Sequence, residues 1–402
     1  MINLAIMGYG TVGSGVYEIA KKNSKSIQRK SGQEICVKRI LDLRDFPDHP
    51  QPELFTKDFS DILNDNDIDI VAEVIGGLKP AYDYTKAALL AGKSVVTSNK
   101  ELVATHGTEL LEIAAQNGVR YMFEASVGGG IPIIHPLTQC LAANELSEIT
   151  GILNGTTNYI LTKMIKKGQS FEEALSDAQD KGYAERNPAA DVEGHDACRK
   201  ICILASLAFG KAVDCDKIHT EGITNITLQD VEYAEQLDYV IKLIGYSKRE
   251  DGKVLCRVSP MLIPVDHPLS GVEDVFNAIM VHGDSIGDVM FYGRGAGKLP
   301  TASAVMADVI DIVKGDGSCY YGWKDAKQDF LEDYTQAPVA LFVRIEGVTH
   351  QQVTEVFGPV TFAVAKDGAD ETVFLTPTAT EAGLREKLSA LGTPISTIRV
   401  LQ

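Results

Sequence analysis

Charged side chains and a strongly apolar helical pattern meet between residues 178 and 210. The stretch reads AQDKGYAERNPAADVEGHDACRKICILASLAFG, and its Asn187-Pro188 pair predicts a turn. We expect one helix after this turn, from about residue 190 to residue 209. At 3.6 residues per turn, Asp196 and Lys200 lie on the stripe of this helix that is otherwise apolar. Two opposite charges therefore continue a face that the rest of the pattern predicts to be buried.

This pair has two interpretations. An aspartate and a lysine four residues apart often form a surface ion pair that stabilises a helix by about 0.3–0.5 kcal/mol. Glu185 and Asp191 stand just upstream, however, so carboxylates are concentrated where the apolar helix begins. Charges at the edge of a core usually have a ligand or a strict partner. A lysine in this position can give or take the proton of an alcohol.

The opening of the chain has the pattern of a dinucleotide-binding site. Residues 2–7 form a nearly continuous apolar run, which is typical of a parallel strand covered on both faces. The candidate cofactor-binding residues follow in one glycine-rich turn, Gly8, Gly10, Thr11, Val12 and Gly13. A helix and a second strand come next, which is the context of a dinucleotide fingerprint. The glycines would let a pyrophosphate lie against the helix N-terminus, and a tight turn without a ligand is the alternative.

The residues after the next strands add further cofactor-binding candidates. Asp42 can accept a hydrogen bond from a ribose 2′-hydroxyl, which favours NAD, whereas Arg44 can pair with a 2′-phosphate, which favours NADP. Both cofactors therefore stay open. A strand over residues 94–100 ends in Asn99 and Lys100, on the side where open α/β sheets bind ligands. A second glycine-rich loop contains Gly297, and we expect the helix after it to begin with Pro300 and Thr301.

Composition narrows the class of protein. A chain of 402 residues exceeds the roughly 250–300 residues of a single core, so we expect several domains. A net charge of −17 argues against binding to nucleic acid. No apolar run approaches the ~18 residues of a membrane span and no leader pattern precedes the first strand, so we expect no membrane association and a cytoplasmic protein. The seven cysteines form no CxxC pair and indicate reduced core thiols, and none of the eight histidines falls in a metal-ligand spacing.

Residues 178–200 resemble the signature of the homoserine dehydrogenase family, Ala-x3-Gly-Tyr-Ala-x2-Asn-Pro-x2-Asp-Val-x-Gly-x-Asp-x3-Lys. Counterparts of other family segments occur in the family's order, namely GYGTVGSG, VVTSNKELVA, FEASVGGGIPII, GILNGTTNYIL and YGRGAGKLPTASAV. The resemblance spans about residues 1–320. It implies NAD- or NADP-dependent interconversion of L-homoserine and L-aspartate 4-semialdehyde, a step toward threonine and methionine.

The resemblance also implies roles for individual residues. Lys200 and Lys100 are the expected proton-transfer lysines, with Asp196 beside the reacting hydroxyl. Glu185 and Asp191 are the expected partners of the substrate ammonium. Carboxylates and lysines suit an amino-acid substrate, because it brings one cation and one anion.

The resemblance also implies a further substrate-binding segment and a site for a monovalent cation. In GILNGTTNYIL a strand ends and a helix begins, with Asn154 or Thr156 as the N-cap, and Thr156 is a candidate substrate-binding residue. Family members hold a monovalent cation, usually Na+, and the matching positions here are Glu124, Val127, Gly129 and Ile131. The family also implies a homodimer or a dimer of dimers.

The fold that we expect is α/β with three parts. Residues 1–130 form a Rossmann-type parallel-sheet domain, completed by about residues 296–325. Residues 131–295 form an α+β substrate-binding and dimerisation domain. Residues 336–402 read as βαββαβ, a ferredoxin-like unit that resembles an ACT domain, the amino-acid sensor of many biosynthetic enzymes. The usual Asp-x-Pro-Gly turn is replaced by EGVTHQQV, so the sequence does not predict feedback by threonine.

The sequence also bears on two alternative functions. A semialdehyde dehydrogenase shares the opening fold but acts through a cysteine thioester, and the segment LNGTTN offers Asn154 and no cysteine. A non-catalytic NAD(P)-sensing regulator could lose Lys100, Asp196 or Lys200, and all three are present. It would also carry a basic or helix-turn-helix segment, which the sequence does not contain.

Overall fold

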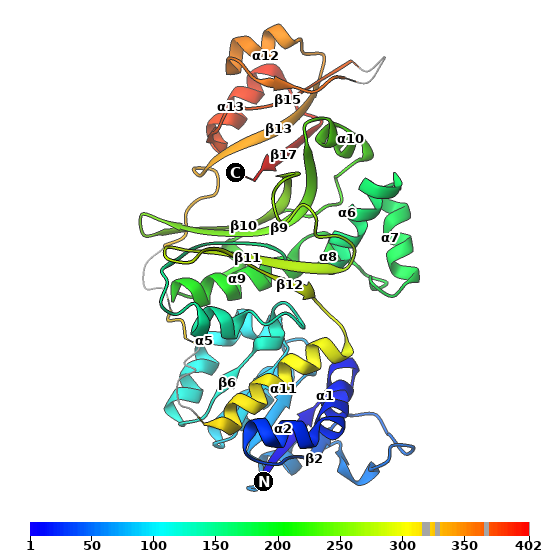
Figure 1. Cartoon of the computed structure of the whole chain (residues 1–402), viewed down its shortest axis with the longest axis vertical. Helices are drawn as coiled ribbons and strands as arrows, with labels where there is room; N and C mark the ends of the chain where they lie inside the picture. The colour runs from blue at the N-terminus through cyan, green and yellow to red at the C-terminus, as the bar shows by residue number, and fades with distance from the viewer. Residues whose placement is uncertain (316–321, 326–329, 366–369, 402) are drawn as a thin grey trace. The chain divides into compact units, whose positions relative to one another are not determined.

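The computed structural model describes residues 1–315, 322–325, 330–365 and 370–401 (Figure 1). It divides into two compact units. The first comprises residues 1–146, 202–216 and 282–327, and the second comprises residues 147–201, 217–281 and 328–402. Among the described residues, no helix combines the length and the apolar character needed to cross a lipid bilayer.

The first unit is built on a six-stranded parallel sheet with the order β3-β2-β1-β4-β5-β6. The strands are β1 (Ile2–Met7), β2 (Ile35–Leu41), β3 (Phe55–Thr56), β4 (Ile70–Glu73), β5 (Ser94–Thr97) and β6 (Tyr121–Met122). Every neighbouring pair is parallel, and β1 and β4 are adjacent where the strand order reverses. This is the strand order of a dinucleotide-binding fold, and the predicted Rossmann-type sheet is therefore confirmed.

The helices of the first unit pack on this sheet. They are α1 (Thr11–Lys22), α2 (Ser24–Ser31), α3 (Ser60–Leu63), α4 (Ala81–Leu90), α5 (Lys100–Gln116) and α11 (Lys298–Lys314). Figure 1 shows α11 beside α1, although almost 300 residues separate their starts. The approach is close, because a Cβ placed on Gly15 would lie 2.9 Å from the Cβ of Ala302.

The second unit contains most of a mixed sheet with the order β11-β7-β9-β10-β17-β13-β15-β14. Its strands are β7 (Leu146–Ile152), β9 (Tyr239–Glu250), β10 (Lys253–Pro264), β11 (Phe276–Gly283), β13 (Pro338–Glu346), β14 (Thr361–Phe362), β15 (Glu371–Leu375) and β17 (Ser396–Val400). Short strands β8 (His219–Thr220) and β16 (Ala379–Thr380) pair with β10 and β13. β12 (Gly287–Arg294) falls in the sequence range of the first unit.

The helices assigned to the second unit precede and follow these strands. They are α6 (Gly155–Lys167), α7 (Phe171–Asp180), α8 (Ala189–Val192), α9 (His195–Phe209), α10 (Leu228–Gln236), α12 (His350–Phe357) and α13 (Glu381–Leu391), with α9 ending in the range of the first unit. Residues 338–400 have the predicted βαββαβ order, and their strands pair antiparallel in the order β17-β13-β15-β14. A buried cluster that includes Val343, Val353 and Leu384 forms the core of this ferredoxin-like part.

Three predicted helices differ from the observed ones. The segment after the opening glycines forms α1 and α2, because the backbone leaves the helical region at Asn23. The helix expected over residues 190–209 is split by Gly194, whose φ of +87° ends α8. α11 begins at Lys298 rather than at Pro300, because a proline is tolerated anywhere in the first turn, where its missing N–H has no helical partner.

The predicted burial of the cysteines is only partly correct. Cys198, Cys202 and Cys256 are buried, whereas Cys140 is exposed and Cys36 and Cys215 are half-buried. Cys140 ends a short π-helical turn, Pro136–Cys140, in which it points outward. Cys319 lies outside the described residues.

Candidate active site

A polar cluster lies in the second unit where β7 ends and α6 begins. Asn154 caps α6, its Oδ1 accepting a hydrogen bond of 2.8 Å from the backbone N–H of Thr157. Its Nδ2 donates to Asp191 Oδ1 at 2.7 Å and to Asp196 Oδ2 at 2.9 Å. One amide group therefore holds two carboxylates together and fixes both against the start of a helix.

Lys200 lies one turn along α9 from Asp196, within the same cluster. Its Nζ donates to Asp196 Oδ2 at 2.7 Å and to the carbonyl oxygen of Leu153 at 2.8 Å. Lys200 is 8 % exposed and Asp196 is 3 % exposed. The pair is thus buried, and the interpretation as a surface ion pair is wrong.

The electrostatics of the cluster favour binding of a cation beside a proton donor. Burial raises the pKa of Asp191, and the neighbouring carboxylate of Asp196 raises it further. The charge on Asp191 is therefore poorly compensated, so the ammonium of a ligand would stabilise it. The buried amine of Lys200 is held by a carboxylate and a carbonyl and is in position to exchange a proton with a ligand hydroxyl.

The other two predicted substrate residues differ, because the Thr156 side chain lies within hydrogen-bonding reach of Asp191 whereas Glu185 lies outside this hydrogen-bonded group. Thr156 is buried at the start of α6, and its Oγ1 donates to the carbonyl oxygen of Tyr183 at 2.7 Å. Glu185 is exposed, and its carboxylate contacts no hydrogen-bond or ion-pair partner among the described residues. His195 is exposed, and its Nε2 lies 3.2 Å from Glu193 Oε2.

The first unit contains the predicted glycine turn. Gly8 has a φ of +96°, and a Cβ placed on Gly13 would lie 1.9 Å from the carbonyl oxygen of Gly8. Both positions therefore require glycine for the turn itself. Gly10 is the N-cap of α1 and makes no side-chain cap, so the N-terminal N–H groups at Thr11 and Val12 are left for an anion.

Asp42 and Arg44 form an ion pair beside this turn. Arg44 Nη2 donates to Asp42 Oδ2 at 2.9 Å, and the backbone N–H of Tyr9 donates to the same oxygen at 2.8 Å. The Arg44 guanidinium lowers the pKa of Asp42 to about 2. The Arg44 side chain is 63 % exposed and borders a cavity of about 410 Å³ whose lining also includes Phe46 and Lys57.

Asn99 and Lys100 occupy the end of β5 and the start of α5. Asn99 caps α5, and its Nδ2 donates to the carbonyl oxygen of Gly77 at 2.7 Å. Lys100 is the first residue of α5 and is half-buried. It belongs to the first unit, whereas Lys200 belongs to the second.

Sequence reasoning missed Glu73, the last residue of β4. Glu73 is fully buried, and its carboxylate accepts hydrogen bonds from Thr97 Oγ1 at 2.7 Å and from the backbone N–H of Ile75 at 2.8 Å. Burial raises its pKa. The sequence did contain a signal for Glu73, because it is an acidic residue at the end of an apolar strand. Such strand ends lie on the side of a parallel sheet where ligands bind.

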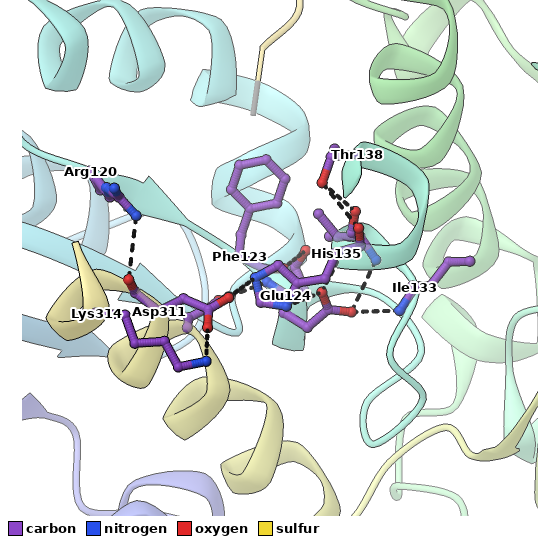
Figure 2. Close-up of polar contacts among 11 residues, drawn as sticks. Arg120, Phe123, Glu124, Ile133, His135, Thr138, Asp311 and Lys314 are labelled. Atoms are coloured by element: carbon purple, nitrogen blue, oxygen red, sulfur yellow. Dashed lines mark hydrogen bonds and ion pairs between the residues drawn. The ribbon is translucent and has the colours of Figure 1, made fainter. Parts of the chain in front are cut away.

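Among the predicted cation ligands, Glu124 follows the end of β6 and contacts the segment that contains Ile133 and His135 (Figure 2). Glu124 Oε1 accepts backbone N–H groups from Ile133 at 2.6 Å and Ile134 at 3.0 Å, and Oε2 accepts that of His135 at 2.7 Å. The carbonyl oxygens of Val127, Gly129 and Ile131 accept no hydrogen bond from any residue in the described ranges. Carboxylate and carbonyl oxygens are the ligand types that a hard monovalent cation takes.

Two titratable residues next to Glu124 were not predicted. Asp308 on α11 is fully buried and accepts the backbone N–H of Glu124 at 2.9 Å, while burial and the nearby Glu124 raise its pKa well above the usual value. His135 Nε2 lies 2.9 Å from Asp311 Oδ2. Burial opposes a charge on His135, but Asp311, Asp308 and Glu124 outweigh it and raise the pKa of His135.

Comparison with known proteins gives consistent results. Residues 8–124 match the family model described as homoserine dehydrogenase, NAD binding domain, and residues 132–310 match the model described as homoserine dehydrogenase. A homoserine dehydrogenase of Bacillus subtilis is 40 % identical over 366 residues, which cover 89 % of this chain and 84 % of the relative.

Solved structures agree with these matches. A homoserine dehydrogenase from Thiobacillus denitrificans is 36 % identical, with a TM-score of 0.89 over 100 % of this chain and 98 % of the other. A hyperthermophilic archaeal homoserine dehydrogenase in complex with NADPH is 28 % identical, with a TM-score of 0.67 over 79 % of this chain and 99 % of the other.

Proposed function

Because this chain belongs to the homoserine dehydrogenase family, we propose that the cluster of Asp191, Asp196 and Lys200 binds the amino-acid substrate and serves its proton transfer. The family's activity is the NAD(P)-dependent interconversion of L-homoserine and L-aspartate 4-semialdehyde, an oxidoreduction at a CH–OH group. The observation that supports the proposed roles is the buried Lys200 amine, bonded to Asp196 and to the Leu153 carbonyl.

Lys200 acts on the oxygen of the reacting carbon. When bound, a reduced nicotinamide would supply the hydride that reduces the aldehyde carbon of the semialdehyde, and negative charge would develop on the aldehyde oxygen. Lys200 stabilises this developing charge and donates the proton that completes the alcohol. In the oxidative direction Lys200 accepts the same proton, while Asp196 holds its amine in place. Lys100 is proposed as the second proton-transfer lysine, because its position matches the family's motif.

The acids of the second unit bind the ammonium of the substrate. Asp191 has a raised pKa because it is buried beside Asp196, and an ammonium would compensate this charge. Glu185 is exposed and contacts no described partner, so its carboxylate is available to a second N–H of the same ammonium. Thr156 and the N–H groups at the start of α6 are proposed to bind the substrate's polar groups.

The first unit binds the nucleotide. The turn at Gly8, Gly10 and Gly13 and the start of α1 hold the pyrophosphate, with Gly297 and Asn99 as further cofactor-binding residues. We favour NADP, because the exposed Arg44 guanidinium borders a cavity that can take a 2′-phosphate, while the Asp42 carboxylate is already bonded to Arg44 and Tyr9. The structure of the archaeal relative is a complex with NADPH, which carries this 2′-phosphate.

A cation site and a higher assembly complete the proposal. Glu124 and the carbonyls of Val127, Gly129 and Ile131 would hold Na+, which would supply positive charge to fix their loop. Residues 1–130 with 296–325, 131–295 and 336–402 serve as nucleotide, substrate and ACT-like domains. A homodimer is proposed from the family, and sedimentation velocity tests it.

The Lys200→Ala variant tests the proposed function. Absorbance of the reduced nicotinamide is followed with L-homoserine and NADP or NAD. We expect kcat to fall about 100-fold or more, since a positioned acid–base group contributes roughly 10²–10⁴. Nucleotide binding, measured by fluorescence titration, should not change.

The matched control is Lys167→Ala, which removes an exposed lysine of α6 in the same unit. It should keep the wild-type rate. Turnover of Lys200→Ala within threefold of the wild type would contradict the assignment of Lys200.

A further inference from the structure

Glu73 is a fully buried carboxyl group that the proposed mechanism does not use. It is the last residue of β4, and the strand pairing places it between Met7 of β1 and Thr97 of β5. All three residues end their strands, so Glu73 lies at the edge of the parallel sheet where such folds bind ligands. Its hydrogen-bond donors are neutral groups of two different segments, and a buried carboxylate depends on such donors.

The first donors belong to the loop that follows β4. Glu73 Oε1 accepts the backbone N–H of Ile75 at 2.8 Å, and the N–H of Gly76 lies within hydrogen-bonding reach of the same carboxylate. Gly76 and Gly77 have φ angles of +85° and +71°, a region that glycine enters most readily. Glu73 therefore holds the start of a loop that contains two conformationally permissive residues.

This loop packs against the glycine turn at the opening of the chain. A Cβ placed on Gly8 would lie 3.0 Å from the carbonyl oxygen of Val74 and 3.1 Å from the Cα of Ile75. The N–H of Val74 also donates to the carbonyl oxygen of Met7 at 2.9 Å. A shift of the loop would therefore displace atoms against the turn that is proposed to hold the pyrophosphate.

The second donor, the Thr97 hydroxyl, connects Glu73 to the residues that begin α5. Glu73 Oε2 accepts this hydroxyl at 2.7 Å, and Thr97 Oγ1 accepts the backbone N–H of Asn99 at 2.9 Å. A hydroxyl has one hydrogen, so its donation to Glu73 leaves the Oγ1 lone pairs for Asn99. Glu73 thus sets the direction of the hydroxyl that holds the Asn99 backbone.

Asn99 joins the two segments to each other. Its Oδ1 accepts the N–H of Leu102 at 3.1 Å, and its Nδ2 donates to the carbonyl oxygen of Gly77 at 2.7 Å. Its side chain also lies within hydrogen-bonding reach of Glu73. The loop after β4 and the start of α5, where Lys100 is the first residue, therefore belong to one network around one carboxylate.

We propose that Glu73 is a positioning residue for the nicotinamide cofactor, whose carboxylate orients the loop after β4 and the start of α5 without touching cofactor or substrate. The inference rests on the proposed function, because the roles of Asn99 and Lys100 come from it. A carboxylate suits this task, since both of its oxygens accept hydrogen bonds, whereas a glutamine would turn an NH₂ group toward one set of donors.

Two substitutions at Thr97 test the network while the buried carboxyl group stays in place. Thr97→Val keeps the shape of the side chain but removes the hydroxyl, whereas Thr97→Ser keeps the hydroxyl and removes the methyl group. We expect Thr97→Val to raise the Kd for NADPH at least fivefold and Thr97→Ser to bind within twofold of the wild type, as measured by fluorescence titration. If Thr97→Ser bound more weakly than Thr97→Val, the role of Thr97 would be packing and the inference would be wrong.

The matched control is Thr85→Val, which removes the hydroxyl of another buried threonine in the first unit. Thr85 Oγ1 has no hydrogen-bond partner among the described residues, so this variant should bind NADPH like the wild type. An equal loss of affinity in Thr85→Val and Thr97→Val would contradict a specific role of the Glu73 network.

Glu73→Gln tests the carboxylate itself. We expect the Kd for NADPH to rise at least fivefold, while the KM for homoserine at saturating nucleotide stays within twofold, because the acids proposed to bind homoserine belong to the second unit. An equal rise in both constants would indicate a general loss of structure and contradict the inference. The Thr97 pair keeps the test decisive if Glu73→Gln does not fold.

The wild type and Lys200→Ala separate this inference from the proposed function. A wild type that does not bind NADPH saturably would contradict the proposed function and the inference with it. Loss of turnover in Lys200→Ala, together with unchanged NADPH binding in Glu73→Gln and Thr97→Val, would support the proposed function and refute the role of Glu73.

Discussion

At the scale of residues, the proposed substrate cluster depends on one amide. The Asn154 side-chain amide donates hydrogen bonds to Asp191 and to Asp196. Asp196 in turn accepts a hydrogen bond from the Lys200 amine. Two carboxylates that would otherwise repel each other are held at fixed positions around one amine. Removal of one partner of such a buried network is costly, because the remaining charges keep their desolvation penalty.

Glu185 should act on substrate binding rather than on turnover. We expect Glu185→Gln to raise the KM for homoserine about tenfold or more with kcat nearly unchanged, since a charge-assisted hydrogen bond contributes roughly 1.5–3 kcal/mol and serves ground and transition states alike. Steady-state kinetics at saturating nucleotide measure both constants. Glu193→Gln, an exposed acid after α8, is the control. An unchanged KM would argue against this role of Glu185.

Arg44 should decide between the two nicotinamide cofactors. We expect Arg44→Ala to raise the KM for NADPH about tenfold or more while the KM for NADH changes less than twofold, because only NADPH carries the 2′-phosphate. Initial rates with each reduced nucleotide and the semialdehyde provide the measurement. Arg29→Ala removes an exposed arginine of α2 and should change neither constant. An equal effect of Arg44→Ala on both cofactors would show that Arg44 does not read the phosphate.

At the scale of elements, we expect different effects of alanine substitution at two glycines of the opening turn. A Cβ on Gly13 would lie 1.9 Å from the Gly8 carbonyl oxygen, so Gly13→Ala should disrupt the turn and lower the melting temperature by several degrees. A Cβ on Gly10 meets no protein atom within 4 Å, so Gly10→Ala should melt like the wild type. If the pyrophosphate lies on this turn, Gly10→Ala should still weaken NADPH binding at least tenfold. Undiminished binding in a stable Gly10→Ala would place the pyrophosphate elsewhere.

The same scale shows what the sequence could predict. The parallel strands and the turn at Gly8 could be predicted, because an apolar run followed by glycine is a pattern within a few neighbouring residues. The glycine at position 194 is a signal for a helix end. The prediction missed it, because the helical periodicity of apolar residues continues across Gly194. The contacts of Glu124 with Asp308 and of His135 with Asp311 join positions more than 170 residues apart, so no local pattern indicated them.

At the scale of the molecule, the C-terminal βαββαβ part is integrated into the second unit. β17 pairs in parallel with β10, so one sheet continues from the substrate-cluster strands into the ferredoxin-like strands. Arg344 binds Asp230 and Glu371, and Arg399 binds Glu221 and Glu381. The sequence predicted the βαββαβ order but not this pairing, because the register between distant strands depends on tertiary contacts.

The Arg399 network should make the stability of the second unit depend on pH. The His219 and Arg399 side chains outweigh burial and lower the pKa of Glu221 to about 2, against roughly 4.3 in an unfolded chain. A carboxyl whose folded pKa is lowered stabilises the fold above its unfolded pKa, and this contribution is lost as pH falls toward its folded pKa. The stability difference between wild type and Glu221→Gln should therefore shrink as pH falls from about 5 to about 2. Urea midpoints at these pH values measure it, with Glu386→Gln, an exposed acid of α13, as the control. A difference that does not change with pH would mean that Glu221 is not held ionised by Arg399 in the folded chain.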